Sequence, residues 1–149
     1  MPLDGHQIAP QEHVVALVAQ PQSEIAPVLV RWQADRAALN RRYNVEYSTV
    51  RRERFRSFDA GWRTQLKALP FEKLSRPAQV DYLLLDNKLR YELALLDREA
   101  KLASEMAPLL PFADTLAALL EQRRTLQRPI PAATARTIAG MTARIEKVS

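Results

Sequence analysis

The chain contains no cysteine, so disulfide bonds, thiolate catalysis and cysteine-ligated metal sites are all excluded. Glycine is also scarce, with only Gly5, Gly61 and Gly140. Glycine supplies the positive-φ positions on which tight hairpins and phosphate-cradling loops depend. We therefore expect neither a hairpin-rich fold nor a glycine-rich nucleotide-binding loop.

Histidine is equally rare, and its positions do not suit catalysis. The only histidines are His6 and His13, which precede every well-patterned helical segment. No H-E-x-x-H, E-x-x-H or G-x-S-x-G motif occurs, and the inverted zinc motif at His13 would need histidine in place of Ala9. The sequence therefore predicts no catalytic residue, no metal ligand and no cofactor.

No hydrophobic run approaches the roughly 20 residues of a membrane-spanning helix. The stretch at 13–19 is too short, and Asp4 and Glu12 lie where a signal peptide would carry cations. We expect no membrane partner and no targeting signal in the chain as given. The compartment stays open, because a periplasmic or exported protein would show the same pattern after removal of a leader.

What the sequence does contain is the composition of a folded domain. The 149 residues are 47% hydrophobic and 26% charged, close to the averages for globular proteins. This length suits a single domain with one core. We expect one helical domain over 1–149, in which 1–21 is poorly ordered or a short helix and 22–149 forms a bundle.

Proline pairs divide the chain into helical segments, because proline inside a helix loses a hydrogen bond and clashes with the preceding turn. The pairs are Pro70 with Pro77, Pro108 with Pro111, and Pro129 with Pro131. Apolar periodicity predicts helices at about 24–42, 49–69, 78–107, 112–126 and 132–148. Ser23, Ser48 and Ser75 stand where N-caps belong. The predicted fold is all-α: a bundle of four to five helices around the long helix at 78–107.

The long helix carries two apolar faces. One face comprises Tyr82, Leu85, Leu89, Leu93, Leu96, Ala100, Ala103 and Ala107. The second comprises Val80, Leu84, Tyr91, Leu95, Leu102 and Met106, about 140° away around the helix. Both faces need neighbours, and the chain has few other helices to supply them. This geometry predicts self-association or packing against another polypeptide.

The preceding helix bears an aromatic stripe beside a basic one. Phe55, Phe58 and Trp62 fall on one arc, which is more typical of a core than of a ligand groove. The basic stripe consists of Arg52, Arg56, Arg63 and Lys67. Further arginines cluster at 41–42, 51–52 and 123–124, and the net charge is +5.

The basic stripe raises the alternative of nucleic-acid binding, since aligned cations can follow a phosphate backbone. Seventeen acidic residues are interspersed through the chain, and no recognition motif accompanies the stripe. The predicted ion pairs on the long helix, spaced four residues apart, are Asp86 with Arg90, Lys88 with Glu92, and Asp97 with Lys101. Such spacing is typical of solvated helix surfaces. We therefore rank nucleic-acid binding below the structural interpretation.

Four segments carry a family resemblance. They are R-R-Y-N-V-E-Y-S-T-V-R-R-E-R at 41–54, the F-x3-W element from Phe58 to Trp62, V-D-Y-L-L-L-D-N-K-L-R-Y-E-L at 80–93 and L-L-P-F-A-D-T-L at 109–116. Together these segments resemble the N-terminal helical region of the bacterial family catalogued as domain of unknown function number 885. The resemblance covers residues 25 to 149.

The resemblance implies a helical piece of a longer protein. Members of that family are several times longer, often exported, and resemble metal-dependent peptidases whose His/Glu motif lies far toward the C-terminus. No position of this chain matches that motif, so no catalytic residue is carried over. The chain would then be an N-terminal module or a truncated relative, packing against a catalytic part.

Our leading hypothesis is a non-catalytic helical module with a structural role, whose partner is itself or the rest of a longer chain. The alternative is that the chain forms part of the substrate groove of a peptidase-like hydrolase. In that case a peptide would bind the Arg/Tyr-rich stretch at 41–56, with Tyr47 and Arg51 as contact residues. Nucleic-acid binding by the basic stripe is the third hypothesis.

Overall fold

The computed structural model describes residues 23–146, and this part of the chain is all-α. Its helices are α2 (Ala26–Arg42), α3 (Thr49–Lys67), η1 (Phe71–Lys73), α4 (Arg76–Met106), α5 (Ala113–Arg124) and α6 (Pro131–Ile145). No strand occurs among these residues. The predicted bundle of four to five helices around one long helix is confirmed, and α4 is that helix.

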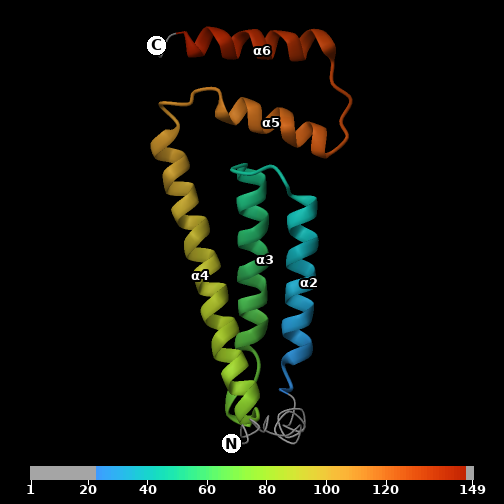
Figure 1. Ribbon diagram of the computed structural model, residues 1–149, viewed down its shortest axis with the longest axis vertical. Coiled ribbons are helices and arrows are strands. Elements are labelled where there is room, and N and C mark those ends of the chain that lie inside the picture. The colour runs from blue at the N-terminus through green and yellow to red at the C-terminus, as the bar shows by residue number, and fades with distance from the viewer. Residues whose placement is uncertain (1–22, 147–149) are drawn as a thin grey trace, which may run out of the picture.

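The helices form two groups that differ in direction (Figure 1). The helices α2, α3 and α4 run side by side along the length of the molecule. The helices α5 and α6 lie across the end at which α4 finishes. Because α5 and α6 do not run along α4, only α2 and α3 of the described helices pack along its length.

The core lies between α4 and its two lengthwise neighbours. Its buried members are Trp32, Leu66, Leu85 and Leu89, and partly buried side chains pack around them: Val28, Leu29, Phe58, Trp62, Leu69 and Tyr82. The aromatic stripe of α3 therefore belongs to the core, as the sequence predicted. Phe55, on the same helix, is 1% exposed.

The first apolar face of α4 is the face turned to the core. Leu85, Leu89 and Leu96 are buried, and Leu93 is partly buried. Burying a leucine side chain completely contributes about 1.5–3 kcal/mol. This face therefore holds α4 against α2 and α3.

The second apolar face of α4 is left open by the described part of the chain. Its exposed members are Val80, Leu84, Tyr91, Leu102 and Met106. Leu95, near the middle of this face, is partly buried. The other helices of the described residues thus cover one face of α4 and not the other.

The serine caps are confirmed at two of their three positions. The Ser48 Oγ accepts a hydrogen bond from the backbone N–H of Arg51, and the Ser75 Oγ accepts one from Ala78. The predicted cap at Ser23 is wrong, because the N-cap of α2 is Ile25. Proline fits only the first turn of a helix, so Pro27 fixes the start of α2 near Ala26, too far along the chain for Ser23 to cap it.

The predicted helix limits are correct to within a few residues. The helix α3 ends at Lys67 rather than at Leu69, and α5 ends at Arg124 rather than at Leu126. The expectations for residues 1–21 and for the last turn near Val148 fall outside the described residues.

Candidate functional site

Two arginines of the basic stripe of α3 pair with acids of α4. The Nη2 atom of Arg56 lies 2.7 Å from Oδ1 of Asp97, and Nε of Arg63 lies 2.8 Å from Oδ1 of Asp86. These two arginines therefore hold α3 to α4, and their charges are matched within the fold. Lys67, at the end of the stripe, is exposed.

The other arginines named for this surface stabilise the turn between α2 and α3. Arg52 donates to the carbonyl of Tyr47 at 2.6 Å. Arg51 donates through Nε to the carbonyl of Tyr43 at 3.1 Å, and its guanidinium lies 4.6 Å from the centre of the Phe55 ring. Tyr47 itself is exposed at the turn with φ 61°. Five of the six predicted interaction residues thus lie either between α3 and α4 or at this turn, and Lys67 belongs to neither group.

The ion pairs predicted along α4 form in two of three cases. Asp86 pairs with Arg90 at 3.3 Å, and Lys88 pairs with Glu92 at 2.7 Å. The third prediction is wrong: Asp97 pairs with Arg56 of α3, and Lys101 pairs with Glu105 at 3.8 Å instead. Asp97 points toward α3 and pairs there with Arg56.

A charged cluster lies inside the bundle, and it was not expected from the sequence. The side chain of Asp59 is completely buried and accepts two hydrogen bonds from Nη1 of Arg36, at 2.9 and 2.8 Å. Arg36 also donates through Nη2 to Glu92 at 2.6 Å. One arginine of α2 thereby joins α3 and α4.

Burial raises the pKa of Asp59 above its ordinary value, and the Arg36 guanidinium opposes that rise. The same guanidinium lies over the rings of Trp32 and Phe55, with 5.9 and 5.2 Å to the ring centres. A buried carboxylate with a raised pKa can signal catalysis when it borders a cleft. Asp59 lines neither the cavity at the end of α5 nor the smaller one between α5 and α6. The contacts that the cluster makes are structural, since Arg36 of α2 binds Asp59 of α3 and Glu92 of α4.

A cavity of about 1110 Å³ opens where the turn after α2 meets the end of α5. Its walls come from 41–47 on one side and from 120–126 on the other, and none of them from α4. The lining includes four arginines, Arg41, Arg42, Arg123 and Arg124, against a single acid, Glu46. Two exposed apolar side chains, Tyr47 and Leu126, also line it.

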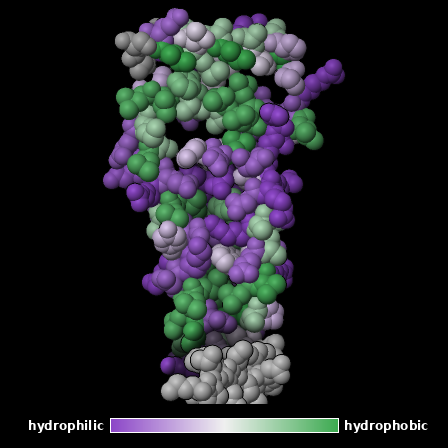
Figure 2. All heavy atoms as spheres, viewed as in Figure 1, coloured by the Kyte–Doolittle hydropathy of each residue, from purple (hydrophilic) through white to green (hydrophobic). Residues whose placement is uncertain are grey.

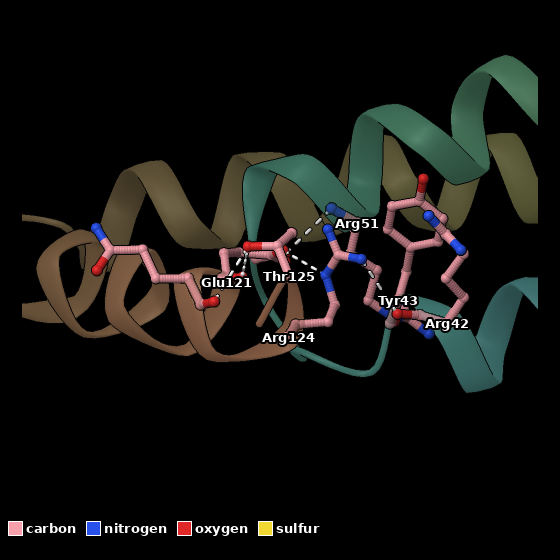
Figure 3. Close-up of polar contacts among 8 residues, drawn as sticks. Arg42, Tyr43, Arg51, Glu121, Arg124 and Thr125 are labelled. Carbon is pink, nitrogen blue, oxygen red and sulfur yellow. Dashed lines mark hydrogen bonds and ion pairs between the residues drawn. The ribbon is translucent and has the colours of Figure 1, made fainter. Parts of the chain in front are cut away.

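A chain of polar contacts holds the two walls together (Figure 3). Ser48 donates through Oγ to Glu121 at 2.8 Å, and Arg124 donates through Nε to the other oxygen of Glu121 at 2.6 Å. The Arg124 guanidinium also stacks 4.6 Å from the centre of the Tyr43 ring. Its Nη1 reaches the carbonyl of Arg42 at 3.4 Å.

The arginine pairs that line this cavity are visible in the sequence, but their proximity in the fold is not. The pairs at 41–42 and 123–124 each close a helix, at the ends of α2 and α5. Cations are common there because the C-terminal end of a helix carries partial negative charge. Only the fold shows that these two helix ends lie side by side. Of the two residues named for a peptide groove, Tyr47 lines the cavity and Arg51 does not.

Exposed apolar side chains are concentrated in the second half of the described chain. Figure 2 shows hydrophobic side chains gathered over α5 and α6, with a more hydrophilic region beside them. Within this half, the most exposed are Leu109, Leu126 and Ile130, between 68% and 90% exposed. Leu102 and Met106, at the end of α4, add to the exposed apolar side chains of this part of the molecule. Such surfaces on a folded domain commonly mark interaction sites.

Within residues 23–146, no three histidine, cysteine or acidic side chains come together in a group able to hold a metal ion. His6 and His13 lie outside these residues. None of the helices described is both long enough and apolar enough to cross a bilayer.

Comparison with known proteins found no match to this chain among family models, curated proteins or solved structures. The resemblance to domain-of-unknown-function family 885 therefore stays a prediction.

Proposed function

We propose that this chain is a non-catalytic helical module that pairs with a second copy of itself through the second apolar face of α4. The observation that carries the proposal is the exposure of that face. Leu84 and Tyr91, in the middle of a 31-residue helix, are 62% and 55% exposed. A helix that is apolar on two sides is stable in water only when both sides are covered.

The exposed face has the spacing of a helix–helix seam. Leu84 and Tyr91 are seven residues apart, as are Leu95 and Leu102, and Leu95 follows Tyr91 by four residues. In a heptad repeat, the positions that face a partner helix recur every 3.5 residues on average. Four of the six such positions from 84 to 102 are apolar, and the other two are Lys88 and Arg98. At about 1.5 Å per residue, the line from Leu84 to Leu102 is roughly 27 Å long.

The charges on this seam favour an antiparallel pair of identical helices. Lys88 and Arg98 lie between the apolar positions, so a parallel pair would set each cation against its own copy. Like charges placed opposite each other are destabilising. An antiparallel pair instead brings Lys88 of one copy toward Glu105 of the other. The side chains of Lys88 and Glu105 are 48% and 58% exposed, and so both can reach a partner.

Sedimentation equilibrium of the whole chain at micromolar concentrations tests this proposal. We expect a dimer for the natural sequence and a monomer for Tyr91→Lys combined with Leu102→Lys. A two-fold interface repeats each substitution, so four charges would enter the seam. Each of these half-exposed side chains would otherwise gain about 1 kcal/mol on burial. The loss of about 4 kcal/mol weakens the dimer by nearly a thousandfold.

Leu83→Lys is the matched control. Leu83 is a leucine like Leu102 and is 58% exposed, but it points about 100° away from Leu102 around the helix. The control variant should remain a dimer. A natural chain that stays monomeric across these concentrations would refute pairing with a second copy. A dimer that both variants leave intact would place the interface elsewhere.

A further inference from the structure

The cavity between the α2–α3 turn and the end of α5 has features that the pairing of α4 does not explain. None of its lining residues belongs to α4. We propose that this cavity is a binding site for an acidic peptide segment that also carries an apolar side chain. The proposal is independent of the dimer and would stand if the chain were a monomer.

The charge of the lining is the first argument. Four arginines and one glutamate line a single cavity, in a chain whose net charge is only +5. Three of the arginines, Arg41, Arg42 and Arg123, are exposed, and their side chains form no ion pair or hydrogen bond with the described residues. Elsewhere in the bundle, arginines such as Arg36, Arg56 and Arg63 are paired with acids. The cavity thus holds unmatched positive charge.

The ends of α2 and α5 account for part of this charge, since basic residues stabilise the last turn of a helix. Among the four arginines of the cavity, only Arg124 binds a carbonyl at the end of a described helix, that of Arg42. The N–H groups of the Arg41, Arg42 and Arg123 guanidiniums form no hydrogen bond with the described residues and can therefore donate to a ligand. Guanidinium groups bind carboxylates through paired, parallel hydrogen bonds. Side-chain carboxylates of a peptide match these donors.

The apolar part of the lining is the second argument. Tyr47 and Leu126, one on each wall, are 78% and 90% exposed. Both have positive φ angles, 61° and 57°, which are rare for large side chains. The backbone thus adopts an uncommon conformation on both walls while presenting an apolar side chain at the same cavity. Arginine with tyrosine is the composition typical of protein-binding surfaces.

The walls are held in place before any ligand binds. Ser48 is 2% exposed and joins the turn to Glu121 of α5. Arg124, 14% exposed, joins Glu121 to the end of α2. A site whose walls are already fixed binds with a smaller loss of conformational freedom. The cavity volume of about 1110 Å³ slightly exceeds that of most small-molecule pockets and suits an extended segment.

Fluorescence anisotropy with the full chain tests the site, using a labelled peptide of alternating glutamate and leucine as the probe. We expect saturable binding that weakens at least tenfold in Arg41→Ala combined with Arg123→Ala. These side chains come from opposite walls and have no polar partner among the described residues, so the fold should be kept. Far-UV circular dichroism checks this point. Leu126→Ser should weaken binding several-fold without changing the net charge.

The control variant is Arg54→Ala combined with Arg136→Ala. It removes the same charge from exposed positions that do not line the cavity, and its binding should stay within twofold of the natural chain. Equal losses in both double variants would show a general charge effect and overturn the site. Equal binding of an alternating lysine–leucine peptide would overturn the acidic specificity. Displacement of the probe by inorganic phosphate, beyond that caused by sodium chloride of equal ionic strength, would identify a phosphate site instead.

Discussion

Replacing Arg36 by alanine should destabilise the bundle more than any other substitution of a charged residue in the described part of the chain. The guanidinium of Arg36 is the only ion-pair partner that the structure gives Asp59, whose side chain is completely buried. The same group binds Glu92, 13% exposed. Removing one member of a buried pair leaves the other charge unmatched, which costs about 3–5 kcal/mol. We expect a loss near 3 kcal/mol, because Lys88 continues to bind Glu92.

The loss should depend on pH in a direction that the structure fixes. Burial raises the pKa of Asp59 in the folded chain, and Arg36 opposes this effect. Without Arg36, the folded-state pKa of Asp59 rises further above the unfolded value of about 3.9. The folded variant then binds this proton more readily than the unfolded chain, so its stability falls as pH rises through that interval. The variant should therefore be closest to the natural chain in acid and furthest from it at neutral pH.

Urea denaturation followed by circular dichroism, near neutrality and at about pH 5, measures both effects. Arg31→Ala is the control on the same helix. Arg31 is 79% exposed and lies 3.8 Å from Asp35, an exposed pair that contributes about 0.5 kcal/mol or less. Arg36→Met combined with Asp59→Leu should recover most of the stability, because both charges leave together. Equal losses for Arg31→Ala and Arg36→Ala, or a loss that grows toward acid pH, would refute this reasoning.

Three further predictions concern helix caps, helical glycines and the core, and the same urea denaturation assay measures the free energy of unfolding for each. Ser48→Ala should cost about 1–2 kcal/mol because it removes an N-cap and the contact to Glu121, whereas Ser23→Ala should cost almost nothing, since its buried hydroxyl has no partner among the described residues. Equal effects of the two would contradict the cap assignment. Gly61→Ala and Gly140→Ala should each stabilise the chain by about 0.5–1 kcal/mol, because both glycines are inside helices and an added Cβ meets nothing within 4 Å. A loss at either position would show a contact absent from this structure. Leu89→Ala should cost about 2–5 kcal/mol, and a cost below 1 kcal/mol would mean that the first face of α4 is not the core.

The positions of the helices could be predicted because their causes are local. Proline pairs end the helices, and Ser48 and Ser75 start two of them with a side-chain hydrogen bond. The two faces of α4 followed from spacing alone. Spacing alone could not show which face the chain itself covers, since this depends on where α5 and α6 turn after Met106. They cross the end of α4, so no helix of the described residues covers the second face.

The partners of the charged residues could not be predicted in the same way. Helical spacing reveals pairs such as Lys88 with Glu92 because both lie on one helix. Arg36 and Asp59 are 23 residues apart on different helices, and nothing local links them. The arginine-lined cavity is a stronger case, because its two walls are separated by the whole of α3 and α4. Contacts of this kind become visible only once the helices are placed.

The pairing of α4 can be tested most directly with engineered cysteines, since the natural chain has none. In the antiparallel register that brings Lys88 toward Glu105, Tyr91 of one copy lies opposite Leu102 of the other. Oxidation of a mixture of Tyr91→Cys and Leu102→Cys chains should give a disulfide-linked heterodimer, in higher yield than either variant gives alone. Cross-linking within each variant alone, or none in the mixture at concentrations where the chain sediments as a dimer, would contradict the account.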